Sequence, residues 1–283
     1  MKGVIALDID GTITSQHHAI PSDVVEYLNM LAEDGWQIIF ITGRTFLWGY
    51  QVLQFLPFHY HLAVQNGAII LEMPSRKIIS KKYLHKEIIP VMEQICRGEA
   101  TDFVIYCGYE YQDLCYWRPS RFSDTLLRYL QRRTTNLKES WESVSEFNSL
   151  DLADFPAVKC FGHYEPSLRI AAKIEQDLGL NVPIIRDPYD ENYFLIQATH
   201  PMINKGEALK NFIKITGYSG VMIAAGDDNN DRTMLAAAHI KIVMESAPKD
   251  MQAQADIIAP PATENGIISG LSQALQLLKN WYR

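Results

Sequence analysis

Three short apolar segments of this chain each end in a cluster of polar residues, and this pattern limits the fold strongly. The segments are residues 4–7, 37–41 and 220–225, and their length and composition are those of buried β-strands. A helical pattern with one apolar face, residues 22–34, separates the first two. Apolar strands that alternate with helices indicate an α/β fold, in which helices cover both faces of a parallel sheet. Because ligands bind beyond the carboxyl ends of such strands, the polar clusters mark the predicted site.

The first cluster contains two carboxylates two residues apart, Asp8 and Asp10, followed by Gly11. Carboxylates held close together resist both being ionised unless a cation lies between them. The pattern therefore indicates either a divalent metal or an acid and a nucleophile that share one site. Taken alone, an ordinary acidic turn explains it equally well, because Asp-Gly is a common turn pair.

The composition of the whole chain narrows the class of protein. Its 283 residues suffice for one large domain or two ordinary ones, and a hydrophobic content of 47% can supply a sizeable core. No window has the long uncharged apolar stretch of a membrane span, and the N-terminus has no signal-peptide pattern, so we expect a cytoplasmic protein. The net charge of −7 argues against a nucleic-acid polymer as partner but permits a small phosphorylated substrate.

Neither the cysteines nor the histidines are spaced as in a metal cluster. The cysteines lack a Cys-x-x-Cys pair, so we expect reduced and mostly buried thiols. The pairs His17-His18 and His59-x-His61 have no third partner and are predicted to be loop residues. The four cysteines are Cys96, Cys107, Cys115 and Cys160.

The alternation of strands and helices changes between about residues 81 and 200. This segment mixes helical patterns with strand-like runs, and the runs 103–106 and 114–117 are joined by a turn typical of an antiparallel hairpin. We therefore predict that residues 81–200 form an α+β domain. It is inserted between the two parts of the α/β domain, residues 1–80 and 201–283.

Three further groups are predicted to join the first cluster at the same edge of the sheet. They are Thr42-Gly43-Arg44 after the second strand, Lys205 at a helix start, and Asp227, Asn230 and Asp231 after the third strand. Each has a simple structural explanation: a strand-end hydroxyl, a helix lysine, and an N-cap with an acidic first turn. Together they fit metal-assisted phosphoryl transfer, which needs a nucleophile, an acid, donors for the phosphoryl oxygens and a hard cation. Carboxylate and carbonyl oxygens suit Mg²⁺ better than zinc.

Six motifs follow one another along nearly the whole chain. They are Asp8-Ile9-Asp10-Gly11-Thr12, Ile41-Thr42-Gly43-Arg44, Asn66-Gly67-Ala68, Lys205-Gly206-Glu207-Ala208-Leu209, Gly226-Asp227-x-x-Asn230-Asp231 and Ala255-Asp256 with Glu264-Asn265-Gly266. This set resembles the haloacid dehalogenase superfamily, and within it the Cof-like sugar-phosphate phosphatases. The inserted segment resembles the family's large C2-type cap in position and approximate size. The resemblance implies a Rossmann-like parallel-sheet core with an inserted α+β cap domain.

The resemblance also implies a role for each catalytic residue. Asp8 would be the nucleophile that forms an aspartyl-phosphate. Asp10 would be the acid that protonates the leaving oxygen and then activates the hydrolytic water. Thr42 would bind the phosphoryl group through its hydroxyl, and Lys205 would offset the charge on that group and on Asp8.

The implied cofactor is Mg²⁺, held by Asp8, Asp227 and the backbone carbonyl of Asp10. Around it, Asn230 and Asp231 would orient the ligands and Lys205. The remaining motif residues are expected near the point where substrate enters. These are Gly43, Arg44 and Asn66.

The function implied by the resemblance is that of a Mg²⁺-dependent phosphatase of small phosphorylated metabolites. Asp10 favours this class, because a dehalogenase needs no leaving-group acid there and the ATPase relatives carry Thr. The alternatives are a hexose-phosphate mutase that uses the same two aspartates and a non-catalytic binding protein. The loop at Glu245 and Ser246 departs from the pattern, since close relatives have Gly-Asn-Ala after the methionine.

Substrate recognition is expected in the inserted segment, where no motif names a ligand. Candidate substrates are hexose phosphates, phosphorylated polyols, and flavin mononucleotide or related nucleotides. The basic cluster Arg128, Arg132 and Arg133 is predicted to be a solvated helix face and only secondarily a substrate-binding patch. The cations to test first, each expected at the surface, are Arg118, Arg121, Lys159 and Arg186.

Overall fold

The computed structural model describes residues 2–16, 19–187 and 189–281, so His17 and His18 lie outside the described residues. The chain forms two compact units. The core unit comprises Met1–Arg44, Trp48–Lys81 and Asn204–Arg283. The inserted unit comprises Thr45–Leu47 and Lys82–Ile203.

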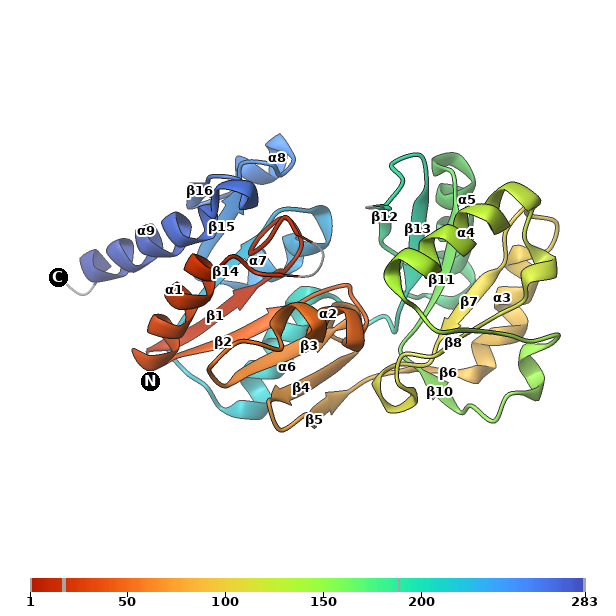
Figure 1. Cartoon of the computed structure of the whole chain (residues 1–283), viewed down its shortest axis with the longest axis horizontal. Coiled ribbons are helices and arrows are strands. Elements are labelled where there is room, and N and C mark those ends of the chain that lie inside the picture. The colour runs from red at the N-terminus through yellow and green to blue at the C-terminus, as the bar shows by residue number, and fades with distance from the viewer. Residues whose placement is uncertain (1, 17–18, 188, 282–283) are drawn as a thin grey trace. The chain divides into compact units, whose positions relative to one another are not determined.

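The core unit is built on an eight-stranded sheet (Figure 1). Neighbouring strands from β16 to β3 are parallel, whereas β3, β4 and β5 pair antiparallel. The predicted α/β fold with a parallel sheet is confirmed, and the antiparallel edge is an addition that was not predicted. In spatial order the strands are β16 (Ile257–Ala259), β15 (Ile240–Met244), β14 (Val221–Gly226), β1 (Gly3–Leu7), β2 (Trp36–Ile41), β3 (Tyr60–Val64), β4 (Ile69–Met73) and β5 (Lys77–Lys81).

The antiparallel edge begins at the short 3-10 turn η1 (Gln65–Gly67). Gln65, Asn66 and Gly67 all have positive φ angles, of 51°, 59° and 100°. This left-handed backbone reverses the chain within three residues, so β4 returns beside β3. Gly67 is required here, because a Cβ atom at this position would lie 2.3 Å from the Cβ of Ala208.

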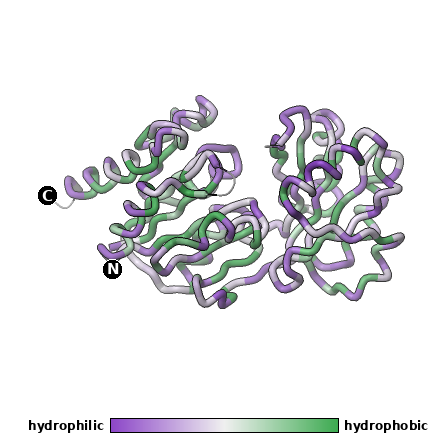
Figure 2. The backbone as a smooth tube through the Cα atoms, viewed as in Figure 1, coloured by the Kyte–Doolittle hydropathy of each residue, from purple (hydrophilic) through white to green (hydrophobic). Residues whose placement is uncertain are grey.

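Helices cover both faces of the core sheet. α1 and α9 pack together on one face, while α6 and α7 pack on the other (Figure 1). Figure 2 shows hydrophobic residues concentrated along the strands and hydrophilic residues on the outer sides of the helices. Each fully buried large apolar side chain stabilises the fold by about 1.5–3 kcal/mol. The helices are α1 (Ser22–Glu33), α2 (Phe46–Leu53), α6 (Lys205–Thr216), α7 (Arg232–Ala237), α8 (Lys249–Gln252) and α9 (Gly266–Trp281).

β1 lies inside the sheet at the point where the strand order reverses. The chain adds β2 and β3 on one side of β1, and after the inserted unit it adds β14 and β15 on the other. Leu7, the last residue of β1, is paired with Phe40 and Ala225 near the ends of its two neighbours. The carboxyl ends of three parallel strands therefore lie side by side, which is where ligands bind in sheets of this kind.

The inserted unit has α+β structure, as predicted. α3 (Ile89–Cys96) and α5 (Tyr164–Leu178) cover one face of a six-stranded sheet, and α4 (Asp124–Leu137) covers the other. The predicted hairpin is confirmed, because β7 and β8 pair antiparallel. A separate two-stranded ladder joins β6 (Leu84–His85) and β10 (Asp154–Phe155). In spatial order the six strands are β12 (Ile184–Arg186), β13 (Phe194–Ala198), β11 (Ala157–Gly162), β7 (Phe103–Tyr106), β8 (Cys115–Trp117) and β9 (Trp141–Ser143).

Three predictions for basic residues of the inserted unit were wrong. Lys159 was expected at the surface but is buried in β11, with 5% of its surface exposed. The other two are arginines. Arg133 is buried on the apolar stripe of α4 rather than solvated, and its guanidinium pairs with Asp187 and Glu139. Arg118 is also buried instead of lying at the surface. Asp102 and Glu93 accept hydrogen bonds from its buried guanidinium. Both side chains are long enough to fill space in the core while their charges are neutralised by carboxylates.

The remaining expectations concern the cysteines, His61 and membrane spans. All four cysteines are reduced and buried, as predicted. His61 is not a loop residue but lies buried in β3, where its ring packs on Phe212. In the described part of the chain, no helix combines the length and apolar character needed to cross a membrane.

Candidate active site

The predicted site residues of the core unit lie at the carboxyl ends of its parallel strands. Asp8 follows β1, Thr42 follows β2, and Asp227 follows β14. Lys205 is the first residue of α6, whose N-cap Asn204 accepts a hydrogen bond from the backbone of Glu207 at 2.9 Å. Residues far apart in the sequence are thus brought together because β1 has β2 and β14 as its two neighbours.

Lys205 is the centre of a buried ion-pair network. Its side chain is 1% exposed, and its Nζ lies 2.5 Å from Oδ1 of Asp8 and 2.6 Å from Oδ1 of Asp231. The second oxygen of Asp231 accepts hydrogen bonds from the backbone amides of Asp227 and Asp228, at 3.0 and 3.1 Å. Asp231 therefore fixes both the lysine and the loop that carries Asp227.

Burial governs the protonation of the two carboxylates beside this network. It raises the pKa of Asp8 well above the usual range, and the Lys205 ammonium only partly opposes this effect. Burial also raises the pKa of Asp227, to about 7, with a further contribution from the Asp231 carboxylate. Raised pKa values of two buried carboxylates indicate an excess of negative charge at the site, which a further cation would neutralise.

The arrangement of oxygen atoms fits a hard divalent cation. Carboxylate oxygens of Asp8, Asp227 and Asp231 all lie within 4.8 Å of one another. Thr12 donates a hydrogen bond to Oδ1 of Asp227 at 3.3 Å, which orients that carboxylate. Gly11 has a φ of +75°, and a Cβ atom there would lie 2.1 Å from an oxygen of Asp227. This close approach explains the glycine, and the all-oxygen donor set suits Mg²⁺.

Asp10 is oriented differently from Asp8. Its side chain is 47% exposed, and it forms a bidentate pair with the buried guanidinium of Arg44, with Nε–Oδ2 and Nη2–Oδ1 distances of 2.7 and 2.5 Å. Arg44 also donates to the carbonyl of Trp48 at 3.1 Å and lies 4.2 Å over its ring. Since a bidentate pair fixes both partners, Arg44 holds the carboxylate of Asp10 in one position.

The two loops after β2 and β3 are linked by hydrogen bonds. Thr42 is buried, and its hydroxyl accepts from the backbone amide of Arg44 at 3.1 Å. The backbone amide of Asn66 donates to the carbonyl of Thr42 at 2.8 Å. The side-chain oxygen of Asn66 is 3.5 Å from Nδ2 of Asn230. Its own Nδ2 is buried and has no hydrogen-bond partner among the residues that the structure describes. Asn66 is therefore a buried donor available to a ligand.

Some contacts of this site were not predicted from the sequence. Thr12 and Trp48 were given no role, although Thr12 stands within the first motif. The pairing of Arg44 with Asp10 was also missed, because the motif spacing alone suggested a contact with substrate. The available signal was an arginine three residues after the end of a strand, in a site that the motifs predict to be rich in carboxylates.

Comparison with known proteins identifies the family of this chain. Residues 5–271 match the family of haloacid dehalogenase-like hydrolases, which covers both units. The chain belongs to this family. The predictions of the family, of the fold and of an enzyme are confirmed.

Two relatives and one solved structure match this hydrolase over nearly their full length. A pyridoxal phosphate phosphatase from Escherichia coli is 24% identical over 279 residues, which are 93% of this chain and 95% of that protein. A putative phosphatase from Bacillus subtilis is 21% identical over 287 residues, 96% and 98% of the two chains. The crystal structure of a haloacid dehalogenase-like hydrolase from Bacteroides thetaiotaomicron has a TM-score of 0.77 at 21% identity, with coverage of 97% and 100%.

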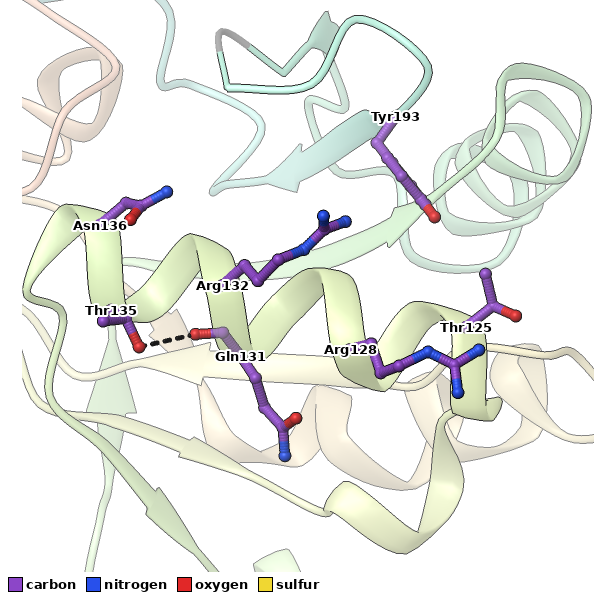
Figure 3. Close-up of a pocket in the computed structure, with 7 residues that line it drawn as sticks. All are labelled: Thr125, Arg128, Gln131, Arg132, Thr135, Asn136 and Tyr193. Atoms are coloured by element: carbon purple, nitrogen blue, oxygen red, sulfur yellow. Dashed lines mark hydrogen bonds between the residues drawn. The ribbon is translucent and has the colours of Figure 1, made fainter.

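A cavity of about 690 Å³ lies along α4 of the inserted unit (Figure 3). It is lined by Arg128, Arg132 and Tyr193, among others. Both arginines are exposed, which agrees with a solvated helix face, whereas Tyr193 stacks on the ring of Tyr129 with 3.8 Å between centroids. Because both guanidinium groups are exposed, solvent screens their charges, and they would attract an anion only weakly.

Proposed function

We propose that this hydrolase is a Mg²⁺-dependent phosphatase that acts on small phosphorylated metabolites through an aspartyl-phosphate. The observation that carries the proposal is the buried network of Asp8, Lys205 and Asp231 beside Asp227. A carboxylate nucleophile next to a fixed cation and a cluster of oxygen ligands is suited to phosphoryl transfer. The names of the relatives, which include phosphatases, agree with this reaction class.

In the first step, a carboxylate oxygen of Asp8 attacks the phosphorus atom. A bond forms between that oxygen and phosphorus, and the bond from phosphorus to the leaving oxygen breaks. Asp10 gives its proton to the leaving oxygen. In the second step Asp10 takes a proton from water, the water oxygen attacks phosphorus, and Asp8 is released together with inorganic phosphate.

The donors around Asp8 bind the phosphoryl oxygens. Lys205 neutralises charge on Asp8 and on the phosphoryl group, and Asp231 keeps the ammonium in place. Thr42 and the unpaired Nδ2 of Asn66 are the polar groups that would complete the binding of the phosphoryl oxygens. Asp8, Asp227 and the backbone carbonyl of Asp10 would hold Mg²⁺, which would supply further positive charge at the phosphoryl oxygens.

Arg44 is proposed to be a positioning residue rather than a substrate ligand. Its guanidinium is buried and already engaged by Asp10 and by the carbonyl of Trp48. Arg44 therefore fixes the position of Asp10, the proposed acid and base of the reaction. The carboxylate of Asp10 is still exposed enough to reach a substrate oxygen.

The inserted unit is proposed to be the cap that selects the substrate, excludes water and supplies specificity. Hexose phosphates, phosphorylated polyols and flavin mononucleotide or related nucleotides are the candidate substrates. Action on free metabolites in the cytoplasm, with no nucleic-acid partner, belongs to the same proposal.

Replacement of the nucleophile tests the mechanism. Asp8→Asn should lower phosphatase activity on an aryl phosphate by more than about 10³-fold, because the amide cannot form the phosphoenzyme. The matched control is Asp23→Asn, which changes an exposed aspartate of α1 and should leave activity unchanged. Activity retained by Asp8→Asn would exclude the covalent mechanism.

The same assay distinguishes a phosphatase from a phosphomutase. A phosphatase releases inorganic phosphate continuously without an activator. If phosphate fails to accumulate and a bisphosphorylated sugar is needed for conversion of a hexose phosphate, the protein is a mutase instead.

A further inference from the structure

Three consecutive residues after the second active-site motif belong to the inserted unit. Residues 45–47 lie in the sequence between Arg44 and Trp48 of the core unit, but their contacts group them with the inserted unit. They include the start of α2, which begins at Phe46. Peptide bonds therefore join this short segment directly to Arg44 on one side and to Trp48 on the other.

A carboxylate of the inserted unit holds this segment. The backbone amide of Leu47 donates a hydrogen bond to Oδ2 of Asp113 at 2.5 Å. The ring of Phe46 packs edge-on against the ring of Tyr109, with 4.6 Å between the centroids. Both partners lie in the turn between β7 and β8. Asp113 is 7% exposed, so water competes little for its hydrogen bond to Leu47.

The same contact supplies an acceptor to the N-terminus of α2. Leu47 is the second residue of this helix, and the first four amides of a helix have no acceptor within it. Here the acceptor comes from a residue 66 positions away in the sequence. Burial raises the pKa of Asp113 to about 6, so its carboxylate is mostly ionised at neutral pH. A negative charge at a helix N-terminus is favourable, and Asp113 therefore stabilises the start of α2.

The turn that carries Asp113 has an uncommon backbone conformation. Gln112 and Asp113 are consecutive residues with positive φ angles of 55° and 56°. Left-handed backbone is uncommon at residues other than glycine and persists where the surroundings fix it. The amide of Asp113 donates to the carbonyl of Gly108 at 2.9 Å, which closes the turn. The closed turn fixes the backbone from which the Asp113 carboxylate projects.

Within the core unit, Arg44 and Trp48 close a loop around the same segment. The guanidinium of Arg44 donates to the carbonyl of Trp48 at 3.1 Å and lies 4.2 Å over its ring. The same guanidinium holds Asp10 by two hydrogen bonds. Residues 45–47 are the stretch of chain between the two ends of this loop. A shift of these residues would therefore displace Arg44 or Trp48, because only peptide bonds separate them.

We propose that Asp113 is a positioning residue for Asp10 and that it acts through residues 45–47 and Arg44. The inference rests on the proposed function, in which Asp10 protonates the leaving oxygen. With the hydrogen bond to Asp113 in place, Arg44 holds Asp10 where it gives its proton to that oxygen. Without this bond the segment moves and proton transfer becomes slower, while Asp8 keeps its own contacts with Lys205.

Two substitutions at residue 113 test the proposal. Asp113→Gly removes the acceptor, and glycine adopts the left-handed backbone of this position without strain. Asp113→Asn keeps an acceptor oxygen, and asparagine also tolerates this backbone. The matched control is Asp151→Ala, which replaces an exposed aspartate of the inserted unit.

The measurement is the dependence of kcat/KM on the leaving group, with Mg²⁺ present. p-Nitrophenolate is a stable anion that leaves with little help from an acid, whereas phenolate needs a proton more. Asp113→Gly should lower kcat/KM about tenfold for phenyl phosphate and less than about threefold for p-nitrophenyl phosphate. Asp113→Asn should stay within about threefold of the unaltered protein on both substrates, and Asp151→Ala should equal it.

Other outcomes would overturn the proposal. An equal fall on both substrates in Asp113→Gly would assign the residue a general structural role, and no fall on either would assign it none. A fall in Asp113→Asn as large as that in Asp113→Gly would exclude the hydrogen bond as the cause.

A double substitution tests the route through Arg44. In an Arg44→Lys background, Asp113→Gly should lower kcat/KM for phenyl phosphate by less than about threefold further, because the two residues act on the same carboxylate. A further fall of the full tenfold would show that Asp113 acts independently of Arg44 and contradict the proposal.

Hydrogen exchange separates this inference from the proposed function. If the unaltered protein hydrolyses neither ester, the proposed function fails, but the contact of Asp113 is still tested. The amide of Leu47 should exchange about tenfold faster in Asp113→Gly than in the unaltered protein or in Asp151→Ala, because its acceptor is gone. Equal exchange would show that Asp113 does not hold the segment and would refute the inference. Asp113→Ala, which also lacks an acceptor, replaces the glycine variant if that variant does not fold.

Discussion

The two units of this hydrolase each bury a lysine, and the two lysines have opposite surroundings. Lys205 of the core unit touches two carboxylates, whereas Lys159 of the inserted unit has an aromatic ring and no paired carboxylate among the described residues. Burial acts to lower the pKa of Lys205, but the charges of Asp231 and Asp8 outweigh it and raise the pKa. Burial lowers the pKa of Lys159 to about 8.

The two units differ in whether the fold places carboxylates beside the buried lysine. In the core unit the ammonium of Lys205 lies between the carboxylates of Asp8 and Asp231, so the buried lysine has partners of opposite charge. In the inserted unit Lys159 is buried on a strand with no carboxylate at ion-pair distance among the described residues, and an apolar residue there would be more stable. The first of the following tests compares the two lysines directly, and the second concerns Lys159 alone.

The largest effect is expected from the removal of the two ammonium groups. Lys205→Met should lower the free energy of unfolding by about 3–5 kcal/mol, because it leaves Asp8 and Asp231 buried without their cation. Lys159→Met should leave the stability equal or higher. Urea denaturation of both variants at pH 7 measures the difference, and a similar loss in both would remove the contrast between the units.

The pH dependence of stability gives the next effect. The pKa of Lys159 falls from its ordinary value of 10.5 to about 8 in the folded protein. Between these pH values the lysine binds more protons in the unfolded chain than in the folded one, so the contribution of Lys159 to the stability, relative to methionine at this position, should rise with pH. The rise is about 3 kcal/mol at most, and Lys159→Met should lack it. Urea midpoints of the two proteins at pH 7 and pH 10.5 test this; parallel curves would contradict it.

Metal binding should affect the core site alone. Mg²⁺ at about 100 times its dissociation constant should raise the stability by about 2.7 kcal/mol, because it binds only the folded protein. Asp227→Asn should abolish this rise in melting temperature, while Lys159→Met should preserve it. A rise that survives in Asp227→Asn would place the cation elsewhere.

The smallest effect is expected at Arg44. Arg44→Lys replaces the bidentate pair with Asp10 by a single contact and should lower kcat by about 10–100-fold, with KM changed less than about threefold. Arg128→Lys, at an exposed position of α4, is the matched control. If KM rises instead of kcat falling, Arg44 contacts the substrate, as the motif alone suggested.

Much of the fold and the candidate site could be predicted because the relevant signals are local. Apolar runs such as residues 37–41 predict buried strands, and the polar residues that follow these runs predict where the strands end. The antiparallel edge was not predicted, because the turn at Asn66 was interpreted without a following strand and β5 is a partly exposed strand with a lysine at each end. The burial of Arg133 was missed although it continues the apolar spacing of Leu126, Leu130 and Leu137 on α4.

The sequence by itself determined the family, the sheet and the set of residues gathered around Asp8, since these depend on motifs a few residues long. Only the tertiary structure decided which partner each charge has. Arg44 faces Asp10, and Lys159 faces Gln197 and Tyr106, because strands distant in sequence are neighbours in the sheet. The sequence does not distinguish a lysine that is paired with a carboxylate from one that is not. Their energies differ only through the residues that the fold places beside them.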